Sequence, residues 1–276
     1  PRLVDGVEPE MGPSAPWTLL LDRDQGLWVG DYQGFIYGVT DGTSRLAAHW
    51  RQRPPTAETS VPAMMQAPDG DLWFATIGGV CVQSGDACPP IDLDGLGFTP
   101  ATSVRAMFTD GHGGVWLGAR HALLHRPAES ARFRSVLDPN GQPLTDVAAF
   151  AEAPDGALWA GTRGGGLLRL SEGQVDRWTR AEGLSSNTLR AVWASPEGEI
   201  WVGTEDAGLC QLSPPYSADP VCLSTAQGLY DDAIHSLLPD DQGRLWMSTN
   251  RGLTWASLGS LRAFVRGEVE GVFTVG

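Results

Sequence analysis

The stretch "PEGEIWVGTEDAGLCQL" at residues 196–212 has a near copy, "PDGALWAGTRGGGLLRL", at residues 154–170. Both contain a turn of the form Pro-acid-Gly, a Trp followed by small residues, a short loop and a second apolar run. The loop differs between the two copies: "RGG" in one is "EDA" in the other. A frame that persists while its loop varies is typical of a structural repeat.

The same frame recurs along most of the chain, at spacings of 42 to 45 residues. Its tryptophans are Trp28, Trp73, Trp116, Trp159, Trp201 and Trp246. Within one unit we expect four short strands, A to D. The Gly of the A–B turn, such as Gly198, supplies the positive φ of a tight hairpin. "EIWVGT" forms strand B, "GLCQL" forms strand C, and strand D is a more variable segment such as "VDRWTR" at Val175–Arg180.

Units of this length, with four strands and a Trp signature, predict an all-β fold, a β-propeller of four-stranded blades. Six repeats are visible, and a seven-bladed ring is open if a further blade lies outside the chain. We expect a single domain over 1–276, with blades near 14–58, 59–101, 102–143, 144–186, 187–230 and 231–276, and residues 1–13 as an edge strand or tail. The six frame tryptophans are expected to wedge between blades as core residues.

Composition narrows the class of protein. Hydrophobic residues make up 42% and charged residues 19%, as in a globular chain. There is no apolar run long enough to span a membrane and no signal-peptide pattern at the N-terminus. The formal net charge of −14 argues against binding to nucleic acid or to an anionic membrane. All 19 basic residues are Arg, which excludes Schiff-base and Walker-A chemistry.

The segment "EGLSSNTLRAVWASPEGEIWVGTEDAGL" at residues 182–209 resembles the two-component regulator propeller repeat. The resemblance covers roughly residues 16–257, with departures at "GARHAL" and "GDYQGF". It implies an extracytoplasmic, periplasmic sensor region of a membrane-anchored bacterial receptor, a histidine kinase, hybrid two-component protein or diguanylate cyclase. It further implies a non-catalytic role, a possible homodimer through the parent receptor, and a short helix-like insert before the last strand.

The four cysteines form two close pairs, Cys81 with Cys88 and Cys210 with Cys222. The propeller arrangement puts the pairs in non-adjacent blades, so we expect two disulfides, each stapling strands C and D of one blade. A zinc site is the alternative, but no C-x-x-C is present. Disulfides imply an oxidising compartment.

We expect ligand binding at the loops whose sequence differs from one repeat to the next. In a propeller, the B–C loops and the D–A crossovers meet at one face, which we call the rim. Forked Arg hydrogen bonds there suit an anionic or sugar-like small molecule or glycan. The candidate ligand-binding residues are Arg105, Arg120, His121, Arg163, Arg190, Glu205, Asp206, His235, Asn250 and Arg251.

Two other functions remain open. A propeller enzyme of lyase or lactonase type would need metal ligands at the channel mouth, for which Asp146, Asn187 and Asp232 are a thin set. His121 and His125 would lie about 13 Å apart on a strand, too far to share a metal. We predict no cofactor, no metal and no catalytic residue. The second alternative is a scaffold that binds other proteins.

Overall fold

In the computed structural model, the regular secondary structure of the described residues consists of β-strands, one α-helix and two 3-10 turns. The structure describes residues 16–40, 43–49, 60–76, 79–83, 88–93, 95–96, 103–217 and 219–275. The predicted tail at residues 1–13 lies outside these ranges. The chain divides into two compact units, Pro1–Val136 and Leu137–Gly276.

The described part of the first unit forms three antiparallel sheets, ordered β1-β2-β3-β4, β5-β6-β7 and β11-β10-β9-β8. The strands are β1 (Pro16–Leu21), β2 (Leu27–Asp31), β3 (Phe35–Thr40), β4 (Thr43–His49), β5 (Ala63–Gln66), β6 (Leu72–Thr76), β7 (Gly79–Val82), β8 (Val104–Thr109), β9 (Val115–Ala119), β10 (Leu123–Arg126) and β11 (Arg134–Ser135). The second sheet has three described strands, and a single bridge from Pro90 to Cys81 stands where strand D is expected.

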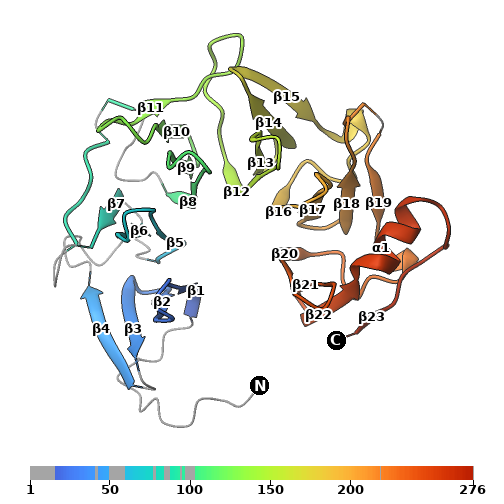
Figure 1. Cartoon of the computed structure of the whole chain (residues 1–276), viewed down its shortest axis with the longest axis horizontal. Coiled ribbons are helices and arrows are strands. Elements are labelled where there is room, and N and C mark those ends of the chain that lie inside the picture. The colour runs from blue at the N-terminus through green and yellow to red at the C-terminus, as the bar shows by residue number, and fades with distance from the viewer. Residues whose placement is uncertain are drawn as a thin grey trace. The chain divides into compact units, whose positions relative to one another are not determined.

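The second unit contains three four-stranded sheets, ordered β12-β13-β14-β15, β16-β17-β18-β19 and β20-β21-β22-β23. Its elements are β12 (Val147–Glu152), β13 (Leu158–Thr162), β14 (Leu167–Ser171), β15 (Gln174–Trp178), η1 (Arg180–Glu182), β16 (Leu189–Ala194), β17 (Ile200–Thr204), β18 (Leu209–Leu212), β19 (Val221–Leu223), η2 (Thr225–Gln227), β20 (Ile234–Pro239), β21 (Arg244–Thr249), β22 (Gly252–Ser257), α1 (Leu258–Val265) and β23 (Thr274–Val275). The A strands β12, β16 and β20 lie side by side (Figure 1).

These sheets confirm the prediction of an all-β fold made of six propeller blades. Helix α1 stands before β23, where the resemblance implied a helix-like insert. The blade limits and the single-domain assignment stay predictions. Among the described residues, no helix is both long enough and apolar enough to span a bilayer.

The frame tryptophans divide into two groups. Trp73, Trp159 and Trp201 are buried, with at most 3% of their surface exposed. Burial of an indole removes about 150–250 Å² from water, which stabilises by up to about 4–6 kcal/mol. Trp28, Trp116 and Trp246 are half-buried. The core role predicted for all six is therefore met in full by three of them.

Each of the three half-buried tryptophans is hydrogen-bonded to a carboxylate. The indole Nε1 of each donates to the first residue of its A–B turn, Asp22, Asp110 or Asp240, at 2.7–2.9 Å. The other three blades have Ala67, Ala153 and Ser195 at that position. Trp201 combines burial with a hydrogen bond from its Nε1 to Glu199 Oε2 at 3.4 Å, so a carboxylate also contacts one of the buried tryptophans.

Both predicted disulfides are present, Cys81–Cys88 and Cys210–Cys222. Cys210 and Cys222 are register partners on β18 and β19, so this bridge joins strands C and D of one blade as expected. Cys81 lies on β7, and Cys88 follows that strand at the start of the segment that returns to Pro90.

Candidate functional site

The rim of the second unit is built from two repeated positions. One is the second residue of strand A, and the other lies four residues after the frame tryptophan. In the blade of β16 these are Arg190 and Glu205, and in the blade of β20 they are His235 and Asn250. In the blade of β12 the second position is Arg163. Repetition therefore brings predicted site residues of three blades to the same end of the strands.

A β-bulge directs the strand-A side chains. The register skips one residue between Leu189 and Ala191 and again between Ile234 and Ser236, so Arg190 and His235 are the unpaired residues. Three further A strands, β1, β8 and β12, skip at the same position. A bulge re-aims a side chain and is common next to binding sites. The sequence carries no visible signal for it, because the bulge residues share no type.

Arg190 and Glu205 form an ion pair, with Nη2 of Arg190 2.5 Å from Oε1 of Glu205. The hydrogen bond from Arg190 lowers the pKa of Glu205, and the charges of Arg163 and His235 lower it further. Both side chains keep part of their surface in solvent, at 24% and 42% exposure. Glu205 N donates to Thr188 O at 3.0 Å and Arg163 is bridged to the same Thr188, so Arg163 and the Arg190–Glu205 pair occupy neighbouring positions of the rim.

His235 and Asn250 form the corresponding pair in the last blade. Nε2 of His235 lies 2.8 Å from Oδ1 of Asn250, and both residues are exposed. The amide keeps its NH₂ group as a donor, because its oxygen is the atom that faces the imidazole. This edge of the rim can donate hydrogen bonds to an anion.

Arg163 is fixed through its backbone. Its N–H donates to Asp146 O at 2.9 Å, and a bridge joins it to Thr188 of the next blade. Gly164 and Gly166 donate to Asn187 O at 2.9 and 3.0 Å. The loop that follows β13 is thereby tied to the crossover that precedes β16.

The side chains of Asn187 and Asp232 serve these crossovers. Oδ1 of Asn187 accepts from Arg180 N at 2.7 Å, at the start of η1. Oδ1 of Asp232 accepts from Thr225 N at 2.7 Å, and its Oδ2 accepts from the Thr225 hydroxyl at 3.0 Å. Asn187 and Asp232, two of the three candidate metal ligands, therefore stabilise the crossover turns through hydrogen bonds. Among the described residues, no group of three or more His, Cys, Asp or Glu side chains is arranged to hold a metal ion.

Two more predicted residues of the second unit stand apart from this cluster. The guanidinium of Arg251 lies 4.7 Å from the ring centroid of Tyr230 and donates to its carbonyl at 3.0 Å. Asp206 is exposed at the tip of its loop. Arg251 thus braces a crossover, whereas Asp206 adds negative charge beside Glu205.

The remaining three candidates, Arg105, Arg120 and His121, belong to the first unit. Arg105 occupies the bulge of β8, the position that Arg190 takes in the second unit. Arg120 and His121 are exposed in the loop after β9, and the Arg120 N–H donates to Ser103 O at 3.3 Å. They form the equivalent rim position of their own blade.

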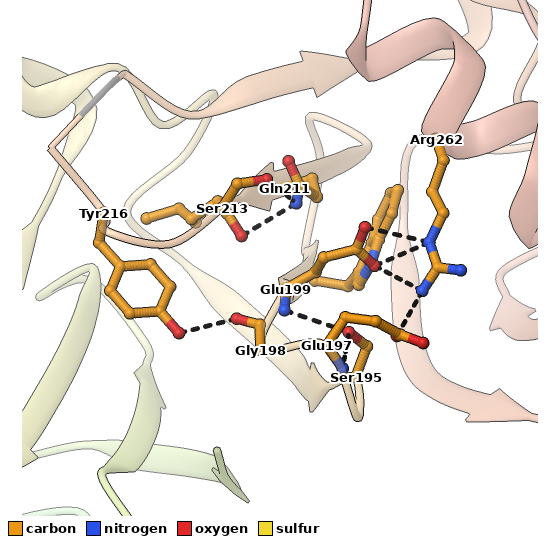
Figure 2. A network of polar contacts seen from close by, with 10 residues as sticks. Ser195, Glu197, Gly198, Glu199, Gln211, Ser213, Tyr216 and Arg262 are labelled. Atoms are coloured by element: carbon orange, nitrogen blue, oxygen red, sulfur yellow. Dashed lines mark hydrogen bonds and ion pairs between the residues drawn. The ribbon is translucent and has the colours of Figure 1, made fainter. Parts of the chain in front are cut away.

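The opposite end of the strands holds a polar network that the sequence did not single out. Arg262 of α1 donates through Nε to both oxygens of Glu199 and through Nη2 to Glu197, as Figure 2 shows. Tyr216 donates its hydroxyl to Gly198 O of the same turn at 2.7 Å. The helix-like insert expected before the last strand was the sequence feature that pointed to this region. The residues that contact the helix could not be predicted from residue spacing.

Comparisons with known proteins agree with the repeat. The family model "Two component regulator propeller" matches residues 231–251, which supports the predicted resemblance. No curated protein sequence matches the chain.

Solved structures show the same fold. The extracellular domain of the hybrid two component system BT3049 from B. thetaiotaomicron superposes with a TM-score of 0.74 at 23% identity, covering 88% of this chain and 32% of that one. The extracellular domain of the hybrid two component system BT4673 from the same organism gives 0.70 at 21%, covering 91% and 32%. Virginiamycin B lyase from Staphylococcus aureus gives 0.69 at 11%, covering 88% and 80%. The chain thus spans about a third of the two sensor domains.

Proposed function

We propose that the chain is a non-catalytic, ligand-sensing propeller from the extracytoplasmic part of a bacterial signal-transduction receptor. The family match and the similarity to extracellular domains of two-component systems support the receptor class. The two disulfides support an oxidising compartment outside the cytoplasm.

The placement of Arg163 beside the Arg190–Glu205 ion pair, with the backbones of Arg163 and Glu205 both bonded to Thr188, carries the proposal for the site. The protein has a net charge of −14, so its overall electrostatic potential is negative. A cluster of basic groups makes the potential locally more positive. Arg forks recognise carboxylate, sulfate and phosphate groups in two-pronged fashion. The ligand class that fits is an anionic sugar or glycan whose acidic group competes with Glu205 for Arg190.

Thermal unfolding with a matched panel tests this function. The panel consists of uronic-acid disaccharides, sulfated disaccharides and sugar phosphates, each beside its neutral counterpart. A ligand that binds only the folded protein raises Tm by mass action. We expect the anionic members to raise Tm and the neutral ones to leave it unchanged. Equal shifts from both classes, or no shift from any member, would reject the anion-sensing rim.

A further inference from the structure

The carboxylate of Glu205 is held by a single contact. Its Oε1 accepts from Nη2 of Arg190, and no second donor to this side chain occurs among the described residues. A carboxylate can accept about four hydrogen bonds, so most of the acceptor capacity of Glu205 is unused. The side chain is also 42% exposed, and it can turn into solvent without losing another partner.

Two other carboxylates of the second unit show the contrast. Asp240 accepts through both oxygens, from two backbone N–H groups, a guanidinium and an indole. Glu199 accepts from Arg262 through both oxygens. These side chains are 19% and 18% exposed. Carboxylates that fix a turn in this unit are therefore held by several donors, and Glu205 is not.

The loop that carries Glu205 does not depend on its side chain. Glu205 N donates to Thr188 O at 3.0 Å. The Thr204 hydroxyl donates to Gly208 O and accepts from Ala207 N, both at 2.9 Å. These bonds hold the loop from the backbone side, so rotation of the Glu205 side chain leaves the loop in place.

Arg190 has donor capacity that Glu205 does not use. Only its Nη2 donates to Glu205, and its Nε has no hydrogen-bond partner among the residues that the structure describes. An oxyanion bound in two-pronged fashion spans two N–H groups of a guanidinium. Such an anion makes one contact more with Arg190 than Glu205 does.

We propose that Glu205 is an internal competitor, which occupies Arg190 while the rim is empty and turns away when the acidic group of a ligand replaces it. This inference rests on the proposed binding of anionic ligands at the rim. An anion that makes one contact only exchanges one ion pair for another, whereas a two-pronged anion gains a hydrogen bond. Glu205 therefore selects carboxylate, sulfate and phosphate groups against simple anions such as chloride.

The charge state of Glu205 agrees with this role. The hydrogen bond from Arg190 lowers the pKa of Glu205, so the carboxylate is ionised at neutral pH. An ionised carboxylate occupies the guanidinium and also repels an approaching anion. Removal of this charge should therefore make Arg190 a better anion site.

NMR of the full chain measures the competition at Arg190 itself. The probe is sodium sulfate, added at constant ionic strength against sodium chloride, and the readout is the Nε–H cross-peak of Arg190. Arg190→Gln removes this cross-peak and so assigns it. We expect sulfate to shift the cross-peak in the native protein, and Glu205→Gln to bind sulfate about two- to fivefold more tightly, the range for one partly exposed ion pair.

Asp206→Asn is the matched control. Asp206 is exposed at the tip of the same loop, so this variant removes the same charge one position away. Solvent and salt screen an exposed charge, and its removal should raise the affinity for sulfate less than Glu205→Gln does. Urea denaturation of both variants confirms that they are folded.

The outcomes separate the competitor from the rim. Equal affinity for sulfate in the native protein and Glu205→Gln would overturn the role of Glu205 while anion binding at the rim stands. An equal gain in Glu205→Gln and Asp206→Asn would overturn it as well, because the effect would then be one of net charge. A cross-peak that sulfate leaves unchanged in both the native protein and Glu205→Gln would reject the inference together with the anion-binding rim.

Discussion

In each blade of the second unit, the frame tryptophan lies on strand B and the rim residue lies four residues later, just after that strand, and the two positions differ in residue type and in their role in packing. The frame tryptophans are Trp159, Trp201 and Trp246, and the rim residues four positions later are Arg163, Glu205 and Asn250. The first two tryptophans are 0% exposed, and the rim residues are half-buried or exposed. Residue identity is constant in the frame and differs at every rim position. This contrast teaches that the positions that stabilise a blade are separate from the positions at which we propose ligand recognition.

The largest expected effect is the loss of a buried frame tryptophan. Trp159 packs 4.8 Å from Tyr216 and 5.1 Å from Trp178, measured between ring centroids. Trp159→Ala should lower the free energy of unfolding by about 3–5 kcal/mol because it leaves a large cavity. Urea denaturation measures it. Trp246→Ala, at the half-buried frame position, is the matched comparison and should cost less; an equal cost would break the division into two groups.

The disulfide of the middle blade should rank next. Cys210 and Cys222 are 12 residues apart, and closing a loop of that size stabilises by about 3 kcal/mol in the chain-entropy account. Replacing both by Ala should lower stability by about that amount, again measured in urea. Replacement of Cys81 and Cys88, whose separation is 7 residues, should cost slightly less. A stability unchanged by either replacement would contradict the assignment of the bridges as staples.

A smaller effect is expected from the carboxylate of the last A–B turn. Partial burial acts to raise the pKa of Asp240, but the backbone of Arg244, the indole of Trp246 and the Arg244 guanidinium outweigh it, and the pKa lies well below its usual range. A carboxylate of depressed pKa stabilises the fold above its unfolded pKa, and that contribution is lost as the pH falls below about 4.

Asp240→Asn should therefore lower Tm at neutral pH and flatten the acid side of the Tm–pH profile. Comparing the native and variant profiles isolates this group from the other acids. Asp155→Asn is a useful second variant, because the Asp155 carboxylate is tied to Arg169 rather than to a tryptophan. Parallel profiles for the native protein and Asp240→Asn would show that the turn carboxylate does not hold its blade.

The smallest effect on stability is expected at the rim. Arg163→Gln keeps the backbone bond to Asp146 and keeps a polar side chain at a half-buried position, so unfolding should change by about 0.5 kcal/mol. Urea denaturation measures the free energy of unfolding of this variant, and Trp159→Ala measured in the same way serves as the comparison. If Arg163→Gln lowered the stability as much as Trp159→Ala, the rim residue would stabilise the fold as strongly as the frame tryptophan. That result would contradict the separation of frame and rim.

The sequence was sufficient for the repeat, for strands A to C and for both disulfides, because period, turn glycines and apolar alternation are local signals. It did not distinguish the two kinds of frame tryptophan, although the Asp six residues before Trp28, Trp116 and Trp246 was readable. That distinction depends on burial by a neighbouring sheet, which spacing does not report.

The ligand-binding role of the candidate residues stays a prediction, and their contacts were harder to predict from the sequence than their places in the repeat. The loop residues of the second unit do share one end of the strands, but the bulge that directs Arg190 and His235 has no sequence signature. The contact of Arg262 with Glu197 and Glu199 joins residues more than 60 positions apart, and no local pattern encodes it. Long-range pairs of this kind require the packed blades.

The most direct test of the separation between frame and rim is a thermal unfolding experiment on one variant, Arg163→Gln combined with Arg190→Gln. The measurement is made with and without the anionic sugar that raises the native Tm most. The account predicts a Tm close to that of the native protein without ligand, and no rise when the sugar is added. A rise equal to that of the native protein would contradict it, because recognition would then lie outside the rim.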